Sequence, residues 1–183
     1  MSVTANGTDR LTIQLLERRD IEPARILHND DTTLVRLTDV MHVSEAQQEA
    51  WFQAMSTSRS SRRYVARRRS DDAFVGVFRI DRLDAWNRGA YVGADVVREL
   101  RGQGYAREMY SYILAYLFDQ CGLNRLGLET LASNDVALGL YRGLGFCEEG
   151  RARQVIYREG RFHDLVLMGL LASEWRTARE AQS

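Results

Sequence analysis

A glycine-rich hexamer in the middle of this 183-residue chain has the residue types of a phosphate-binding turn. It follows a β-type run that ends near Val97, precedes a helical run that begins near Glu108, and reads Arg101-Gly102-Gln103-Gly104-Tyr105-Ala106. A strand that turns through glycines into a helix leaves backbone N–H groups unpaired at the positive end of the helix dipole. Arg101 adds a fixed positive charge. The hexamer therefore predicts a phosphate site, with an ordinary strand-to-helix turn as the alternative.

A second segment, about thirty residues further on, carries an amide and a phenol at helical spacing. Asn134 and Tyr141 are seven positions apart in SNDVALGLYRGLGF, roughly two helical turns, so they face the same way. Gly143, Gly145 and Phe146 then form a helix-to-strand exit. The two side chains could both contact one ligand. Alternatively, Asn134 caps the helix and Tyr141 packs in the core.

Together the two segments resemble the signatures of the GCN5-related N-acetyltransferase (GNAT) family. The first signature, R-x-x-G-x-G/A, is met by Arg101, Gly104 and Ala106. The second, N-x-x-A-x-x-x-Y followed by GF, is met by Asn134, Ala137, Tyr141, Gly145 and Phe146. The resemblance extends from about Thr12 to Trp175 and is closest to the branch of ribosomal-protein N-terminal and spermidine acetyltransferases.

The resemblance implies an α+β (mixed α/β) fold in a single domain, with a central, mostly antiparallel twisted sheet flanked by helices. The acetyltransferase domain would span residues 10–175, between a disordered N-terminus over 1–9 and a polar tail over 176–183. Hydrophobic periodicity predicts strands at 11–15, 62–69, 73–80, 89–97, 125–131, 146–157 and 162–171. It predicts helices at 20–28, 44–55, 104–120 and 135–144. These elements would place the hexamer between a strand and the longest helix.

The same resemblance implies roles for individual residues. The backbone of residues 101–106 would hold the diphosphate of acetyl-CoA, the expected cosubstrate. Val96 and Val97 align with residues whose backbone binds the pantetheine arm, and one of their N–H groups would polarise the acetyl carbonyl. Asn134 would bond to an amide of that arm. Tyr141 is the candidate general acid for the departing thiolate.

The base that accepts the proton of the amine is harder to assign. In the resembling branch a glutamate often stands in an A-E-x-G pattern, which here reads Ala90-Tyr91-Val92-Gly93. Tyr91 thus replaces the carboxylate. Asp95, four positions on, is the candidate catalytic base in its place, and the other candidates are Asp81, Asp84 and Glu129.

Composition narrows the function classes. The formal net charge is zero, so nothing global attracts nucleic acid or an anionic membrane. The 25 basic residues are all arginine, which excludes a lysine nucleophile. The stretch over 59–69 (RSSRRYVARRR) is predicted to expose its arginines on one strand face, with contact to the 3′-phosphate of coenzyme A or to an acidic acceptor as the alternative. Cys121 and Cys147 lack a metal-ligand spacing and are predicted to be buried, so no metal site is expected.

The sequence thus predicts an N-acetyltransferase that moves acetyl from acetyl-CoA to a primary amine (a protein N-terminus, a polyamine or an amino sugar) by direct attack. The alternative is a non-catalytic acyl-CoA-binding or sensing module on the same fold, suggested by the missing glutamate. The expected partner is a small-molecule or peptide amine, and the apolar strand over 165–171 could pair across a homodimer. No secretory signal and no apolar run of about 18 residues is found, which favours a cytoplasmic protein.

Overall fold

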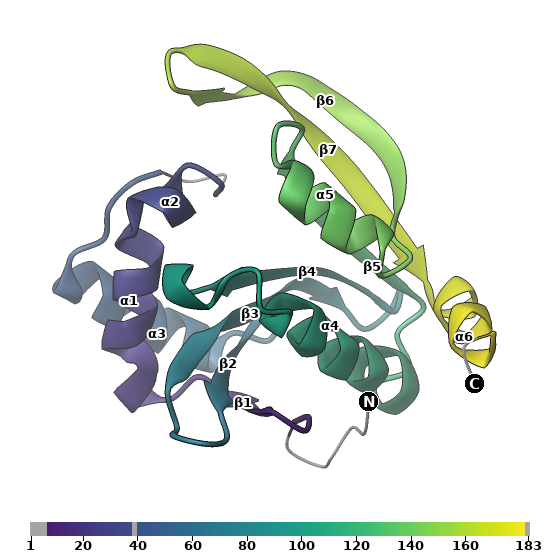
Figure 1. Ribbon diagram of the computed structural model, residues 1–183, viewed down its shortest axis with the longest axis horizontal. Coiled ribbons are helices and arrows are strands. Elements are labelled where there is room, and N and C mark those ends of the chain that lie inside the picture. Colours follow the sequence, from purple (N-terminus) through teal and green to yellow (C-terminus); the bar gives the residue numbers. More distant parts are fainter. Residues whose placement is uncertain (1–6, 38–39, 182–183) are drawn as a thin grey trace.

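A seven-stranded sheet forms the centre of the molecule (Figure 1). The computed structural model describes residues 7–37 and 40–181. The strand order is β1-β2-β3-β4-β5-β7-β6, in which β4 and β5 are parallel and the other neighbours are antiparallel. The strands are β1 (Leu11–Leu15), β2 (Arg62–Arg68), β3 (Phe74–Asp84), β4 (Gly89–Val96), β5 (Arg125–Leu131), β6 (Cys147–Arg158) and β7 (Arg161–Leu171). This architecture confirms the mixed α/β class and the mostly antiparallel sheet.

Helices cover both faces of the sheet. They are α1 (Ile21–Asn29), α2 (Asp31–Leu34), α3 (Glu45–Thr57), α4 (Tyr105–Ala115), α5 (Asp135–Arg142) and α6 (Ala172–Glu180), with short 3-10 turns at Arg18–Asp20 and Arg98–Leu100 and a π-helical turn at Tyr116–Gln120. A capping box formed by Ser44 and Gln47 opens α3, at the start predicted for this helix. In the described part of the chain, no helix has the length and apolarity that crossing a membrane requires.

Strand alternation assigns each half of the core to one face. Phe78 of β3 packs edge-on against Tyr110 of α4, with 4.9 Å between ring centroids. Its neighbour Val77 points the other way and packs with Ala24 and Leu27 of α1. The α4 face therefore holds the larger core, and α1 covers only part of the opposite face.

The sheet opens between its two parallel strands. β4 pairs with β3 along most of its length, but it pairs with β5 only from Gly89 to Tyr91, opposite Arg125 to Gly127. Beyond these residues the two strands diverge, and α5 and the β6–β7 hairpin lie on the far side of the opening from α1 and α2 (Figure 1). The second half of β4 therefore has a backbone edge without a strand partner, next to the start of α4.

Some side-chain predictions from the sequence were wrong. Cys121 and Cys147 are exposed, because one follows the last helical turn before β5 and the other begins the exposed edge strand β6. The arginines of β2 do not all face solvent. Arg67 is only 9% exposed and its guanidinium is 2.5 Å from the buried Asp20 carboxylate, while Arg63 pairs with Asp81. Paired arginines can be buried, which the alternation of residue types alone does not show.

The ends of the chain also differ in detail from the expectation. Residues 1–6, part of the N-terminus expected to be disordered, lie outside the described residues. Thr8 is fully buried and its hydroxyl donates to the Glu108 carboxylate. At the other end α6 continues to Glu180, into the segment expected to be a polar tail.

Candidate active site

The glycine-rich hexamer forms a left-handed turn into α4. Gly102 and Gly104 have φ values of 74° and 83°, a conformation that side chains with a Cβ rarely adopt. The first helical hydrogen bond runs from the Glu108 N–H to the Gly104 carbonyl, at 3.1 Å. Within the described chain, the N–H groups of residues 102–107 donate no hydrogen bond. The turn thus gathers unpaired donors at the positive end of an eleven-residue helix.

The side chain of Arg101 points away from this turn. Its Nε donates to the Val96 carbonyl at 2.9 Å, and its terminal nitrogens donate to the hydroxyls of Thr32 and Thr33 at 2.6 and 2.7 Å. The Asp30 carboxylate is 3.7 Å from the same guanidinium. The positive charge predicted for phosphate therefore lies against α2, where it ties that helix to the end of β4.

A different arginine, which the sequence reasoning missed, lies at the turn. The Arg10 guanidinium donates to the Gln103 carbonyl at 3.3 Å and lies 4.5 Å from the centroid of the Tyr105 ring. It also pairs with the buried Glu108 carboxylate at 2.6 Å, which neutralises an acidic group in the first turn of α4. The Arg10 side chain is 49% exposed. No pattern in the sequence links position 10 to position 103, because the contact depends on the docking of β1 beside α4.

The opening beside β4 exposes one of the two predicted valine amides. The Val97 N–H donates to the Val75 carbonyl at 3.0 Å, and the Val97 carbonyl accepts from the Leu100 N–H at 3.0 Å. Successive residues of a strand direct their N–H groups to opposite sides, so Val96 faces the opening. Of the two valines named from the sequence, Val97 therefore uses its polar groups inside the protein, whereas the Val96 N–H donates to no residue in the described part of the chain.

Asn134 caps α5 and still keeps its donor group. Its Oδ1 accepts a hydrogen bond from the Ala137 N–H at 3.3 Å, the capping geometry that the alternative interpretation predicts. Its Nδ2 donates to no residue in the described ranges. Capping and ligand binding are thus compatible, since they use different atoms of the amide.

Tyr141 lies in an aromatic cluster between α4 and α5. It is 8% exposed and packs edge-on against Tyr110 and Phe146, with 5.7 and 6.0 Å between ring centroids. Burial raises the pKa of the Tyr141 hydroxyl, although Tyr110 and the Arg79 guanidinium act against this shift. A phenol with a raised pKa stays protonated at neutral pH, as a general acid must. The neighbouring Tyr110 hydroxyl is fully buried and makes no hydrogen bond to a described residue.

Asp95 is held in an ion pair. One of its carboxylate oxygens is 2.5 Å from Nη1 of Arg79, and this carboxylate raises the pKa of the Arg79 guanidinium. The guanidinium lies against Gly93, where an added Cβ would be 2.5 Å from Nη2 of Arg79. Asp95, the candidate base from the sequence, is therefore not a free carboxylate.

Tyr91, which stands where the resembling branch has glutamate, lies beside the same opening. Its ring would be 3.2 Å from a Cβ added to Gly127, and the Arg82 guanidinium stacks on it at 4.5 Å from the ring centroid. Tyr91 is thus held between a glycine and an arginine. No group of three or more His, Cys, Asp or Glu side chains in residues 7–37 and 40–181 is placed to hold a metal ion.

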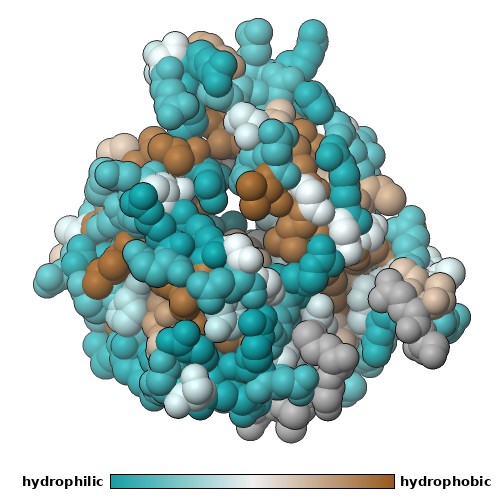
Figure 2. Space-filling view, viewed as in Figure 1, coloured by the Kyte–Doolittle hydropathy of each residue, from teal (hydrophilic) through white to brown (hydrophobic). Residues whose placement is uncertain are grey.

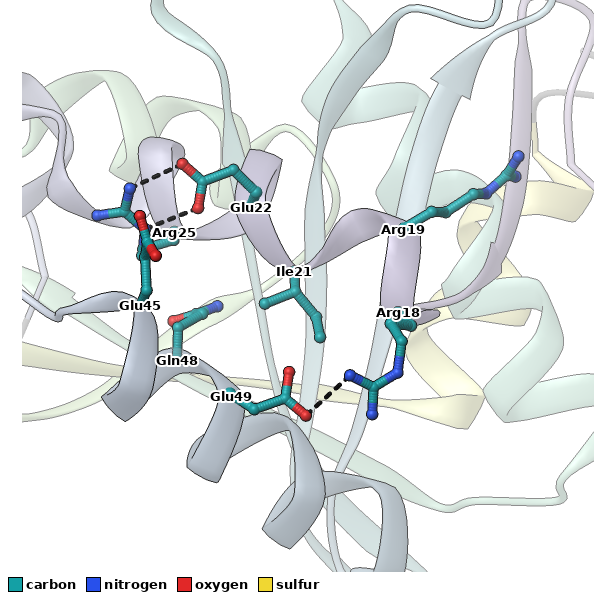
Figure 3. A pocket seen from close by; sticks show the side chains of 8 residues that line it. All are labelled: Arg18, Arg19, Ile21, Glu22, Arg25, Glu45, Gln48 and Glu49. Atoms are coloured by element: carbon teal, nitrogen blue, oxygen red, sulfur yellow. Dashed lines mark hydrogen bonds and ion pairs between the residues drawn. The ribbon is translucent and has the colours of Figure 1, made fainter.

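The surface is hollowed between α2 and the turn before α4 on one side and α5 on the other (Figure 2). A separate pocket of about 520 Å³ lies between α1 and α3 (Figure 3). Four of its charged groups form two ion pairs, Arg18 with Glu49 at 3.0 Å and Arg25 with Glu22 at 2.7 Å. This pocket contains none of the predicted site residues, so it is distinct from the candidate active site.

The opening between β4 and β5 lies beside the unpaired N–H groups at the start of α4, an arrangement that suits an acetyltransferase. Comparison with known proteins gives the same class. The family model of the acetyltransferase (GNAT) domain matches residues 10–147. The chain therefore belongs to the GNAT acetyltransferase family. It is an acetyl-CoA-dependent N-acetyltransferase.

Individual relatives share limited sequence identity with this chain. YdaF of Bacillus subtilis, whose name assigns it provisionally as a ribosomal N-acetyltransferase, is 32% identical over 105 residues, which cover 57% of each protein. Spermidine N(1)-acetyltransferase of Vibrio cholerae is 25% identical over 174 residues, 93% of this chain and 98% of the relative. The crystal structure of the Vibrio cholerae spermidine N-acetyltransferase with CoA and spermine superposes with a TM-score of 0.87 at 24% identity, covering 92% of this chain and 99% of that one. At this identity the superposition shows a shared fold.

Proposed function

We propose that the protein transfers the acetyl group of acetyl-CoA directly to a primary amine. The observation that carries this proposal is the row of unpaired N–H groups over 102–107, which lies beside the opening between β4 and β5. The amine nitrogen forms a bond to the thioester carbonyl carbon, the carbon–sulfur bond breaks, and the sulfur leaves with a proton. No covalent enzyme intermediate is needed.

The donor is held by backbone groups. The amides of residues 102–107 bind the diphosphate, and Arg10 supplies the positive charge that the sequence had assigned to Arg101. The free Val96 N–H polarises the acetyl carbonyl, a contact of the kind worth about 10²–10³ in rate. The Nδ2 of Asn134 donates to the pantetheine arm. These roles fix the thioester at the opening of the sheet.

Tyr141 is the general acid. Its hydroxyl donates the proton that the departing sulfur takes, and its burial keeps it protonated until then. Positioned acids of this kind contribute about 10²–10⁴ in rate. The proton released by the amine goes to solvent, because the candidate base Asp95 is already paired with Arg79.

The acceptor is a protein N-terminus, a polyamine or an amino sugar. The names of the Bacillus subtilis and Vibrio cholerae relatives support the first two. The proposal takes residues 10–175 as the catalytic domain. The cytoplasmic location and the homodimer remain predictions from the sequence.

A thiol-release assay tests the proposal. The intact protein is mixed with acetyl-CoA and, one at a time, with a short peptide bearing a free N-terminus, spermidine and glucosamine. We expect amine-dependent release of CoA with at least one of them. Binding of acetyl-CoA without release for any amine would instead favour a sensing module.

A further inference from the structure

Four carboxylates and four arginines share the sheet face opposite α4. The strand register places them there: Arg63 opposes Arg79, Arg79 opposes Gly93, and Tyr91 opposes both Asp81 and Gly127. Because Phe78 points to α4, its neighbours in β3 point to this other face. The pairs are Arg63–Asp81 at 2.8 Å, Arg79–Asp95 at 2.5 Å, Arg82–Glu129 at 3.2 Å, and Arg125 with Glu149.

Two of these pairs flank the opening of the sheet. Asp95 lies four residues beyond Tyr91 in β4, and Glu129 lies two residues beyond Gly127 in β5, past the last β4–β5 pair on each side. An amine that meets the thioester on this face therefore passes Asp95 and Glu129. Both carboxylates are already bound by guanidinium groups, from Arg79 and Arg82 respectively.

The balanced charge disfavours a polycation as acceptor. A polyamine carries several ammonium groups, and a site for it needs carboxylates whose charge is free to attract them. On this face each of the four carboxylates faces an arginine, so the local field is close to neutral. A polyamine would also have to approach four guanidinium groups of its own sign.

Among the described residues, the two carboxylates that flank the opening are both paired with arginines, so neither is free to deprotonate the amine. An alkylamine with a pKa near 10.4 is only about 0.1% neutral at pH 7.4, so it depends on a base. An α-amino group with a pKa near 7.8 is roughly 30% neutral at the same pH. A site without a free base can therefore acetylate an α-amino group, but it acetylates an alkylamine only very slowly.

From these observations we infer that the acceptor is an amine of low basicity, with a pKa near 8, such as the α-amino group of a peptide chain. This inference rests on the proposed function and specifies its substrate. Arg79 and Arg82 determine the specificity, because they occupy the carboxylates that would otherwise serve an alkylamine.

A competition within one molecule tests the inference. The acceptor is a short peptide with a free N-terminal alanine and one internal lysine, so that an α-amine and an ε-amine share one scaffold. The intact protein and acetyl-CoA are incubated with it at pH 7.5, and fragment-ion mass spectrometry locates the acetyl group. We expect at least tenfold more product at the α-amine. We also expect kcat/KM for this peptide to exceed that for spermidine.

A variant sharpens the test. Arg82→Gln frees the Glu129 carboxylate at an exposed position, and Arg88→Gln in the turn between β3 and β4 is the matched control. We expect the first variant to shift the α-to-ε product ratio toward the lysine by several fold and the second to leave it unchanged.

Preferred acetylation of the lysine or of spermidine by the natural protein would overturn the inference while the proposed function stands. An unchanged product ratio in Arg82→Gln would overturn the role of the Arg82–Glu129 pair. Absence of turnover with every amine, although acetyl-CoA binds, would overturn both the proposed function and the inference.

Discussion

The guanidinium of Arg10 donates two hydrogen bonds of 3.3 Å to the carbonyl of Gln103, a residue 93 positions away in the chain. This contact fixes one side of the turn whose amides face the proposed diphosphate. It also leaves about half of the Arg10 side chain exposed at the turn. The charge that the family motif would assign to Arg101 is thus supplied from the start of β1.

Replacing Arg10 should weaken donor binding more than chemistry. In Arg10→Gln, with Glu108→Gln added so that no buried carboxylate is left unpaired, we expect KM for acetyl-CoA to rise about tenfold, roughly 1.4 kcal/mol. The kcat should change little, because neither residue contacts the acetyl group. Steady-state kinetics measure both constants. Arg19→Gln removes the same charge at an exposed site near Asp72 and should leave them unchanged.

Arg101 should behave as a structural residue. Its guanidinium joins the Val96 carbonyl to the hydroxyls of Thr32 and Thr33, so Arg101→Met removes three hydrogen bonds between the end of β4 and α2. We expect the free energy of unfolding to fall by about 1–3 kcal/mol in urea denaturation. The exposed Arg98, three residues earlier, offers a control, since Arg98→Met should have almost no effect on stability. A loss of acetyl-CoA affinity at full stability would assign the guanidinium to the ligand instead.

Alanine substitutions at two glycines distinguish the effect of backbone strain from an effect on ligand binding. Gly102 and Gly122 have φ values of 74° and 66°, and a Cβ at either would meet nothing within 4 Å. Alanine at each should therefore cost a similar 1–2 kcal/mol, roughly, in stability because of the left-handed backbone. Only Gly102→Ala should also raise KM for acetyl-CoA, since only Gly102 lies in the turn. Equal kinetics in the two variants would remove the turn from the donor site.

The two tyrosines of the aromatic cluster should respond differently to loss of the hydroxyl. Tyr141→Phe should lower kcat by about 10²-fold or more, with KM for acetyl-CoA nearly unchanged. Tyr110→Phe removes a buried hydroxyl that makes no hydrogen bond to a described residue, so stability should stay equal or increase. Because this hydroxyl only opposes the rise in the pKa of Tyr141, kcat should fall far less than in Tyr141→Phe. Comparable kcat values for natural protein and Tyr141→Phe would exclude Tyr141 as the acid.

The pH profile should show one rising limb. With an α-amino acceptor, kcat/KM should increase up to about pH 8 as the amine loses its proton, and then level off. The acid form of Tyr141 exists below its pKa, and burial raises that pKa above its ordinary value of 10. No decline is therefore expected below about pH 10. A decline between pH 8 and 9 in initial rates would point to another acid.

Local patterns in the sequence were sufficient for all seven strands, for four of the six helices and for the glycine turn, but not for α2 and α6. The hexamer forms the predicted glycine turn between a strand and a helix, and the alternation of β3 and β4 gives the correct strands. The mixed sheet and the family followed from two motifs in order.

The sequence could not predict which side chains pair with one another, because these contacts depend on how distant elements pack together. The Arg101 guanidinium donates to the hydroxyls of Thr32 and Thr33, and the Arg10 guanidinium donates to the Gln103 carbonyl. The Val97 N–H donates to the Val75 carbonyl. The pairing of Asp95 with Arg79 is likewise a matter of strand register. Strand register is fixed only when the whole sheet assembles.

Calorimetry with two ligands is the most direct measurement of how the donor is held. The intact protein is titrated with coenzyme A and with pantetheine, which has the same arm and thiol but lacks the nucleotide and its diphosphate. If the unpaired N–H groups of residues 102–107 bind the diphosphate, coenzyme A should bind with one-to-one stoichiometry and at least a hundredfold more tightly than pantetheine. Equal affinities for the two ligands, or no heat with coenzyme A, would contradict that account.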